Sequence, residues 1–323
     1  MKIGSVGTSN ITEMFLSAVK HVENMEHTAV YSRNRSTAER FAEKTGAEHI
    51  FTDPADMAKS GTIDAVYIAS PNRFHFEQSK LFLTHGIHVF CEKPLTTTKA
   101  QEEELIALAE AKGLIYTEAI MSIHTWAFRL LKEEIKKIGK IRTVNLIFCQ
   151  LSSKYPAYLN GANPNIFNPE MHTGCLMDIG VYNIYLAAAL FGRPDSIVSH
   201  AVFLPSGADA SGTAVLRYGD MLVNLIYSKT GQNYAPSEII GDEGTISLGS
   251  VSQLTGVRIT RGGNTERLVE DHLSRDVIMG MEAAYFRDAV SSGYNEDYVF
   301  AKNTSLLVRE ITDIIRKQNC FPF

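Results

Sequence analysis

A lysine that follows a buried strand pattern is the first residue of this sequence with clear chemical potential. Lys93 stands in the run Cys91-Glu92-Lys93-Pro94, directly after the apolar pattern His88–Cys91. In an open parallel sheet, the carboxyl ends of the strands border the ligand crevice. A lysine there that is partly shielded from water can transfer a proton, or its cation can polarise an oxygen. We therefore expect Lys93 to be catalytic rather than an ordinary surface lysine.

A second chemical pair lies in the middle of the chain. Asp178 and Tyr182 are four residues apart at the start of the predicted helix Met177–Phe191, so they share one helix face. The positive end of a helix favours a carboxylate. A tyrosine hydroxyl beside a carboxylate and a lysine ammonium is a candidate proton relay. We interpret both residues as catalytic; the alternative is a tyrosine that only packs in the core.

A turn near the N-terminus is typical of dinucleotide binding. It follows the predicted strand Lys2–Gly7 and opens the helix Ile11–Val22. Aligning Gly7 with the first glycine of G-x-G-x-x-G places Ser9 and Thr12 at the other two positions, so the motif is degenerate but its strand–turn–helix context is the required one. Glycine lets the backbone approach a pyrophosphate at the helix N-terminus. The residues expected to bind the cofactor here are Gly7, Thr8, Ser9, Asn10 and Ile11.

The end of the second strand indicates which cofactor is preferred. An NAD site usually carries an acid there for the ribose 2′-hydroxyl. Here the strand ends in Tyr31-Ser32-Arg33, without an acid. Ser32 and Arg33 can instead bind a 2′-phosphate through charge-assisted hydrogen bonds. We expect NADP to be preferred and NAD to remain possible; the alternative is a solvated basic loop.

The elements that must position these residues differ between the two parts of the chain. Up to residue 120, short apolar strands alternate with amphipathic helices, which predicts a doubly wound parallel sheet of the Rossmann type. After it, a helix, a long strand, a loop rich in Asn, Pro and Gly, and a second helix lead into a run of strands joined by Gly turns. That order predicts an α+β domain with a large, mainly antiparallel open sheet. We assign the fold to the α/β class, with domains 1–120 and 121–323, the last helix being free to pack back on the first domain.

Composition excludes several classes of protein. Hydrophobic residues make up 45% and charged residues 21%, which is typical of globular domains. The net charge of −5 and the dispersed Lys and Arg residues argue against nucleic acid or an anionic membrane as partner. Four scattered cysteines lack zinc spacing and fit a reducing compartment. We expect a cytoplasmic protein without a metal and without a membrane span.

The motifs resemble those of the Gfo/Idh/MocA oxidoreductase family, and they occur in the family's order. Besides Glu92-Lys93-Pro94, they include Ser70-Pro71-Asn72 with His75, Glu118-Ala119-Ile120-Met121, and the segment from Thr173 to Tyr182. The resemblance covers essentially the whole chain. It implies further cofactor-binding residues, namely Ser70, Pro71, Asn72, His75, Glu92 and Lys93.

The resemblance also implies the reaction. Relatives transfer a hydride between NADP(H) or NAD(H) and a carbinol or carbonyl of a sugar, polyol or inositol-like substrate. Many have His where this sequence has Tyr182, which leaves the substrate and the proton donor open. Asn165, Asn168 and His172, in the loop before Asp178, are candidate contacts to a hydroxyl-rich substrate, with ordinary turn chemistry as the alternative.

Two other functions on the same fold stay open: a hydrolase or epimerase that retains its nicotinamide cofactor, and a non-catalytic ligand sensor. The family also implies a homodimer or homotetramer formed through the sheet of the second domain.

Overall fold

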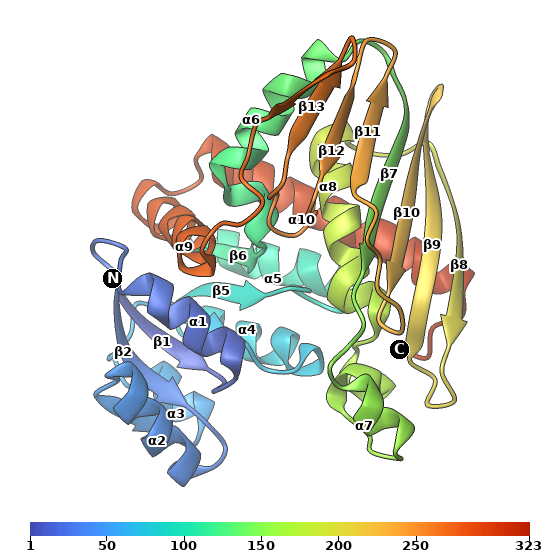
Figure 1. Cartoon of the computed structure of the whole chain (residues 1–323). Coiled ribbons are helices and arrows are strands. Elements are labelled where there is room, and N and C mark those ends of the chain that lie inside the picture. Colours follow the sequence, from blue (N-terminus) through green and yellow to red (C-terminus); the bar gives the residue numbers. More distant parts are fainter. The chain divides into compact units, whose positions relative to one another are not determined.

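Two sheets organise the chain in the computed structural model, which describes residues Met1–Phe323 (Figure 1). The first compact unit comprises Met1–Ile120 and Ser274–Leu306, and the second comprises Met121–Leu273 and Leu307–Phe323. The first unit therefore takes residues from both ends of the chain. Helix α10 (Glu296–Gln318) begins in the first unit and ends in the second.

The sheet of the first unit has six parallel strands in the order β3-β2-β1-β4-β5-β6. This is the strand order of a dinucleotide-binding fold, and it confirms the predicted doubly wound domain. The strands are β1 (Lys2–Val6), β2 (Glu26–Tyr31), β3 (His49–Phe51), β4 (Ala65–Ile68), β5 (His88–Glu92) and β6 (Tyr116–Ala119). The helices between them are α1 (Asn10–Val19), α2 (Arg35–Thr45), α3 (Pro54–Lys59), α4 (His75–Thr84) and α5 (Lys99–Lys112).

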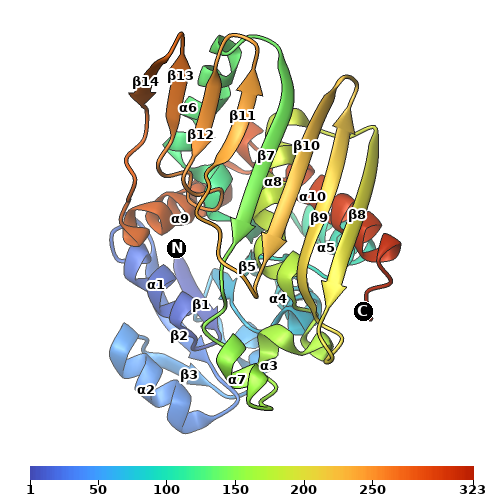
Figure 2. The same cartoon turned by 45° about the vertical axis from the view of Figure 1, so that its right-hand side comes forward.

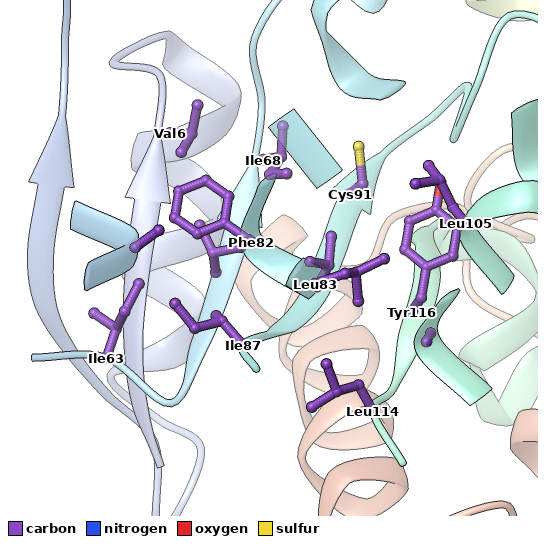
Figure 3. Close-up of a cluster of buried hydrophobic side chains, with 14 of the residues drawn as sticks. Val6, Ile63, Ile68, Phe82, Leu83, Ile87, Cys91, Leu105, Leu114 and Tyr116 are labelled. Atoms are coloured by element: carbon purple, nitrogen blue, oxygen red, sulfur yellow. The ribbon is translucent and has the colours of Figure 1, made fainter. Parts of the chain in front are cut away.

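Alternate residues of the central strands face two different cores, because successive side chains of a strand point to opposite faces. On one face, Phe15 of α1 stacks on Tyr67 of β4 at 3.9 Å between ring centroids, and Phe90 of β5 stacks on Phe286 at 4.7 Å. On the other face, a cluster of buried hydrophobic side chains packs the strands against α4 and α5 (Figure 3). Its members include Val6, Ile68, Phe82, Leu83, Cys91, Leu105 and Tyr116.

Helix α9 (Arg275–Ser292) and the first half of α10 complete this unit, although they follow the strands of the second sheet in the sequence. Phe286 belongs to α9. In α10, the hydroxyl of Tyr298 donates to the Tyr116 carbonyl at 3.3 Å, and the hydroxyl of Ser305 donates to the Glu118 carboxylate at 2.7 Å. Both α9 and the first part of α10 therefore belong to the first unit.

The sheet of the second unit has eight strands in the order β14-β13-β12-β11-β7-β10-β9-β8. All neighbours are antiparallel except β7 and β10, which are parallel. The prediction of a large, mainly antiparallel sheet is confirmed. The strands are β7 (Ile141–Cys149), β8 (Ser196–Phe203), β9 (Asp209–Tyr218), β10 (Met221–Ser228), β11 (Ser237–Gly241), β12 (Thr245–Leu248), β13 (Arg258–Arg261) and β14 (Asn264–Arg267).

Helix α8 (Val181–Phe191) and the C-terminal part of α10 lie on one face of this sheet, and the opposite face carries no helix (Figure 2). Asn183 of α8 joins the helix to the parallel strand pair, since its amide donates to the carbonyls of Leu146 at 3.2 Å and Ile226 at 3.0 Å. The remaining helix of this unit that is longer than one or two turns is α6 (Trp126–Glu134).

Several short elements were not expected from the sequence. Strands β3 and β14 have three and four residues, too few for a clear alternation. The expected loop before Asp178 contains a short helix, α7 (Tyr155–Leu159). The sequence predicted no membrane span. One helical stretch, Pro169–Phe191, is long and apolar enough to cross a membrane by length and composition, and 83% of its apolar window is buried in the protein.

Candidate active site

The turn after β1 has the geometry that a pyrophosphate requires. Gly7 has a φ of 110°, and a side-chain carbon there would lie 2.8 Å from the Ala69 carbonyl oxygen. Ser9 precedes α1 without capping it through its side chain; its hydroxyl lies 3.2 Å from that of Thr12. The first N–H groups of α1 therefore keep their capacity to bind an anion. Thr8 and Ile11 are half-buried, while Ser9 and Asn10 are exposed.

The end of β2 presents a cation to the solvent. The Ser32 N–H donates to the Phe51 carbonyl at 3.1 Å, which holds the strand end in place. Arg33 is exposed, and no ion pair engages its guanidinium. Asn34 caps α2 by accepting the Thr37 N–H at 3.1 Å. These residues fit a 2′-phosphate, because Arg33 is held at the carboxyl end of β2 and its charge is not already neutralised.

The turn after β4 is joined to the turn after β5 by a buried imidazole. Nδ1 of His75 lies 2.9 Å from the Pro94 carbonyl oxygen, and Nε2 lies 2.8 Å from that of Ser70. Burial lowers the pKa of His75, against the opposing effect of the two carbonyls. His75 thus braces two loops through its side chain. Pro71 and Asn72 follow Ser70 and lead into the short 3-10 helix Asn72–Phe74.

Lys93 lies at the carboxyl end of β5 and is half-buried. Its neighbour Glu92 is buried; the carboxylate accepts the Tyr67 hydroxyl at 2.5 Å and the Lys93 N–H at 3.2 Å. Burial raises the pKa of Glu92, and the nearby Lys93 charge opposes that rise. The Lys93–Pro94 peptide is cis, and the next N–H, that of Leu95, donates to Glu118 at 2.8 Å. Lys93 therefore stands on a loop that its neighbours hold on both sides.

The second unit carries Asp178 in a π-helical turn, Leu176–Gly180, that runs directly into α8. Such turns are rare and often mark functional sites. Because a π turn has more residues than an α turn, the expected alignment of Asp178 with Tyr182 on an α-helical face applies only in part. The side chain of Asp178 is 28% exposed. Tyr182 is buried, and its ring lies 5.9 Å from that of Phe148.

Two glycines of the Thr173–Tyr182 motif are explained by their neighbours. Gly174 has a φ of 127° and approaches Asp209, whose carboxylate accepts the Leu176 N–H at 2.6 Å. A side-chain carbon at Gly180 would lie 3.0 Å from the Tyr227 ring. Burial raises the pKa of Asp209 to about 7, although backbone N–H groups that face it oppose the rise.

A lysine that the sequence analysis missed is paired with Asp178. Lys229 follows β10, is buried, and donates from Nζ to Oδ2 of Asp178. The only sequence signal is a lone charge directly after the alternating strand Met221–Ser228. Asp209, a lone acid between small residues, was missed for the same reason: each partner is distant in the sequence.

The three candidate substrate residues lie in one loop of the second unit. The carbonyl oxygens of Asn165 and Asn168 accept the Thr173 hydroxyl at 2.6 and 3.4 Å. The side chain of Asn168 accepts the Glu170 N–H at 3.1 Å, which is turn chemistry. His172 has a φ of 53°, and its ring stacks on that of Phe323 at 5.2 Å. The loop residues thus have structural roles, and their part in substrate binding stays a prediction.

Comparison with known proteins identifies a family for both parts of the chain. Residues 1–120 match the model of an oxidoreductase family with an NAD-binding Rossmann fold, and residues 128–247 match the GFO/IDH/MocA C-terminal domain. The chain is 42% identical over 269 residues to scyllo-inositol 2-dehydrogenase (NADP(+)) IolU from Bacillus subtilis (strain 168), covering 83% of this chain and 82% of that protein.

More distant relatives cover nearly the whole chain. Trans-1,2-dihydrobenzene-1,2-diol dehydrogenase from Xenopus laevis is 25% identical over 97% of this chain and 96% of its own length. Among solved structures, KijD10, a 3-ketoreductase from Actinomadura kijaniata in complex with TDP-benzene and NADP, in an open conformation, superposes with a TM-score of 0.84. It is 25% identical, and the match covers 99% of this chain and 98% of that one.

Proposed function

Because the chain belongs to the GFO/IDH/MocA family of oxidoreductases, we propose that it is an NADP(H)-dependent dehydrogenase of a polyol, sugar or inositol-like substrate. The observation that carries the proposal is the position of Lys93. It is half-buried at the carboxyl end of β5, on a loop held by Glu92, His75 and Glu118.

The cofactor part of the proposal is supported by the turn after β1 and by Arg33. The uncapped N-terminus of α1 would hold the pyrophosphate, and Arg33 would hold the 2′-phosphate. When bound, the nicotinamide cofactor supplies or accepts the hydride. The NADP dependence named for the Bacillus subtilis relative supports the same preference.

The proton step is assigned to three residues. Lys93 and Tyr182 hydrogen-bond the substrate hydroxyl and accept its proton during oxidation, and they return it during reduction. Asp178 orients Lys93 and Tyr182 and balances the charge of Lys93. A scyllo-inositol dehydrogenase at 42% identity supports a cyclic polyol as the first substrate to test.

Location and assembly belong to the same proposal. Four free cysteines support a cytoplasmic protein. The helix-free face of the second sheet supports a homodimer or homotetramer through that face, because it exposes Val198, Val202, Leu222 and Ile226.

The test is a panel of inositols, sugars and polyols with NADP+ or NAD+, followed at 340 nm. We expect net NADPH formation with at least one inositol. Lys93→Ala should lower kcat by about 10²- to 10⁴-fold while the Kd for NADP stays within a few-fold. Lys80→Ala, which removes a lysine from the exposed pair with Glu104, is the control. Turnover without net NADPH, or full activity of Lys93→Ala, would contradict the proposal.

A further inference from the structure

A buried lysine accompanies the proposed catalytic carboxylate of the second unit. The side chain of Lys229 is only 9% exposed, and its ammonium pairs with Asp178. Lysines are rarely buried unless they are paired, because removing an ammonium from water is costly. The burial of Lys229 therefore suggests that its ammonium has a role toward Asp178.

The backbone around Lys229 is held on both sides. Its N–H donates to the Ala210 carbonyl at 2.8 Å, and its carbonyl accepts the Ser152 N–H at 2.9 Å. The lysine is thus joined to the start of β9 and to the segment after β7. Because hydrogen bonds fix the backbone of Lys229, its side chain starts from a fixed position. Its ammonium can therefore hold a partner in one orientation.

Lys229 is the cation among the charged groups that act on Cys175, which directly precedes the turn that carries Asp178. The elements packed against this turn carry further titratable groups: Arg142 and Cys149 of β7, Asp209, Arg217 and Tyr218 of β9, Tyr227 of β10, and Tyr182 and Tyr185 of α8. The two arginines are engaged elsewhere, since Arg142 pairs with Asp220 and Arg217 donates to the Gly219 carbonyl. Burial raises the pKa of Cys175, Cys149 and Tyr227, so these three stay uncharged near neutral pH. Asp209 is the second acid, and burial raises its pKa to about 7.

We propose that Lys229 is a positioning residue of the reaction: its ammonium holds Asp178 as a carboxylate in one orientation. Asp178 then serves the substrate as a hydrogen-bond acceptor and not as the acceptor of the reacting proton. This inference rests on the proposed function, since it assigns Lys229 a part in that reaction. Lys229 acts through Asp178, whose side chain is the more exposed of the two.

The test is a double-mutant cycle with Lys229→Met and Asp178→Asn, measured on the polyol that the wild type oxidises. Lys229→Met should lower kcat/KM at least tenfold and leave the Kd for NADP within about twofold. Loss of an opposite charge raises a carboxyl pKa by about 1–3 units, so the acid limb of its pH–rate profile should move upward by that amount. Lys229→Arg, which keeps the charge, should restore most of the activity.

The cycle separates action through Asp178 from an independent effect. If Lys229 acts through Asp178, adding Lys229→Met to Asp178→Asn causes no further loss. Losses that multiply, or a Lys229→Met enzyme with the wild-type pH profile and kcat/KM, would overturn the inference. Lys136→Met, which breaks the exposed pair with Glu133, is the matched control and should leave all these values unchanged.

Failure of the proposed function has a different signature. If the wild type oxidises no polyol with either cofactor, both proposals fall. If the wild type is active and Lys229→Met is equally active, only the role of Lys229 falls.

Discussion

At the scale of single residues, local surroundings decide which charged side chain can do chemistry. Arg33 and Arg35 are two residues apart and equally basic. Arg35 donates to Glu39 one helical turn later at 2.9 Å, whereas no ion pair engages Arg33 at the strand end. The charge of Arg35 is already neutralised, and the charge of Arg33 stays available for an anion. Sequence alone singles out Arg33 only through the absence of an acid beside it.

We therefore expect Arg33→Ala to weaken NADP binding selectively. A charge-assisted contact to a phosphate is worth about 1.5–3 kcal/mol, so the KM for NADP should rise roughly 10- to 100-fold while the KM for NAD changes little. The measurement is the ratio of kcat/KM for the two cofactors. Arg35→Ala is the control; an equal effect of both substitutions would assign the preference to general basicity of the loop.

At the scale of elements, the π turn and α8 depend on an acid from another strand. Asp209, at the start of β9, accepts the Leu176 N–H at 2.6 Å and is 1% exposed. Gly174 leaves the space that this carboxylate occupies. The turn that carries Asp178 is therefore held by a residue 33 positions later in the chain. No local pattern could predict that link.

The raised pKa of Asp209 makes the stability of the second unit depend on pH. The folded pKa of about 7 lies above the ordinary value of 3.8, so the folded state keeps a proton that the unfolded state releases between these values. The stabilisation is complete below about pH 4 and is lost as the pH rises toward 7, by about 1.4 kcal/mol per pH unit.

Asp209→Asn keeps an acceptor for the Leu176 N–H but cannot titrate. Relative to the wild type, its free energy of unfolding should therefore improve as the pH rises from 4 to 7. Urea unfolding followed by the fluorescence of Trp126, the single tryptophan, measures this in the second unit. Asp242→Asn, at an exposed acid that accepts the Lys140 N–H, is the control. A difference that does not change with pH would rule out a titrating Asp209.

At the scale of the whole molecule, one face of the second sheet exposes large apolar side chains and carries no helix. Val198 and Val202 of β8 are 61% and 63% exposed, and Ile226 of β10 is 41% exposed. Large apolar side chains exposed on one face are typical of an interface. The alternating strand pattern predicts that such residues share a face, but it does not tell which face a helix covers.

We expect Ile226→Asp to dissociate the assembly. Light scattering coupled to size exclusion should show a dimer or tetramer for the wild type and a smaller species for the variant. Ile314→Asp, at an exposed apolar residue of α10, is the control. A monomeric wild type, or a variant that stays assembled, would contradict the prediction.

The amino-acid sequence by itself determined the two kinds of sheet and the order of nearly all their elements, because strand–helix alternation and turn residues are local signals. It also indicated the turn at Gly7 and, through the family resemblance, the family itself. The end of a buried strand at Lys93, and the spacing of Asp178 and Tyr182 at a helix start, predicted these three residues to be catalytic, and that role stays a prediction.

Only the tertiary structure decided which distant residues meet. It returned Ser274–Leu306 to the first unit, joined Asp178 to Lys229 across 51 positions, and placed His75 between two loops. Such contacts depend on strand order and on the space left by glycines, neither of which follows from local periodicity. For Lys93, where the sequence argument began, the structure added the reason for its fixed position: the side chains of His75, Glu92 and Glu118 hold its loop.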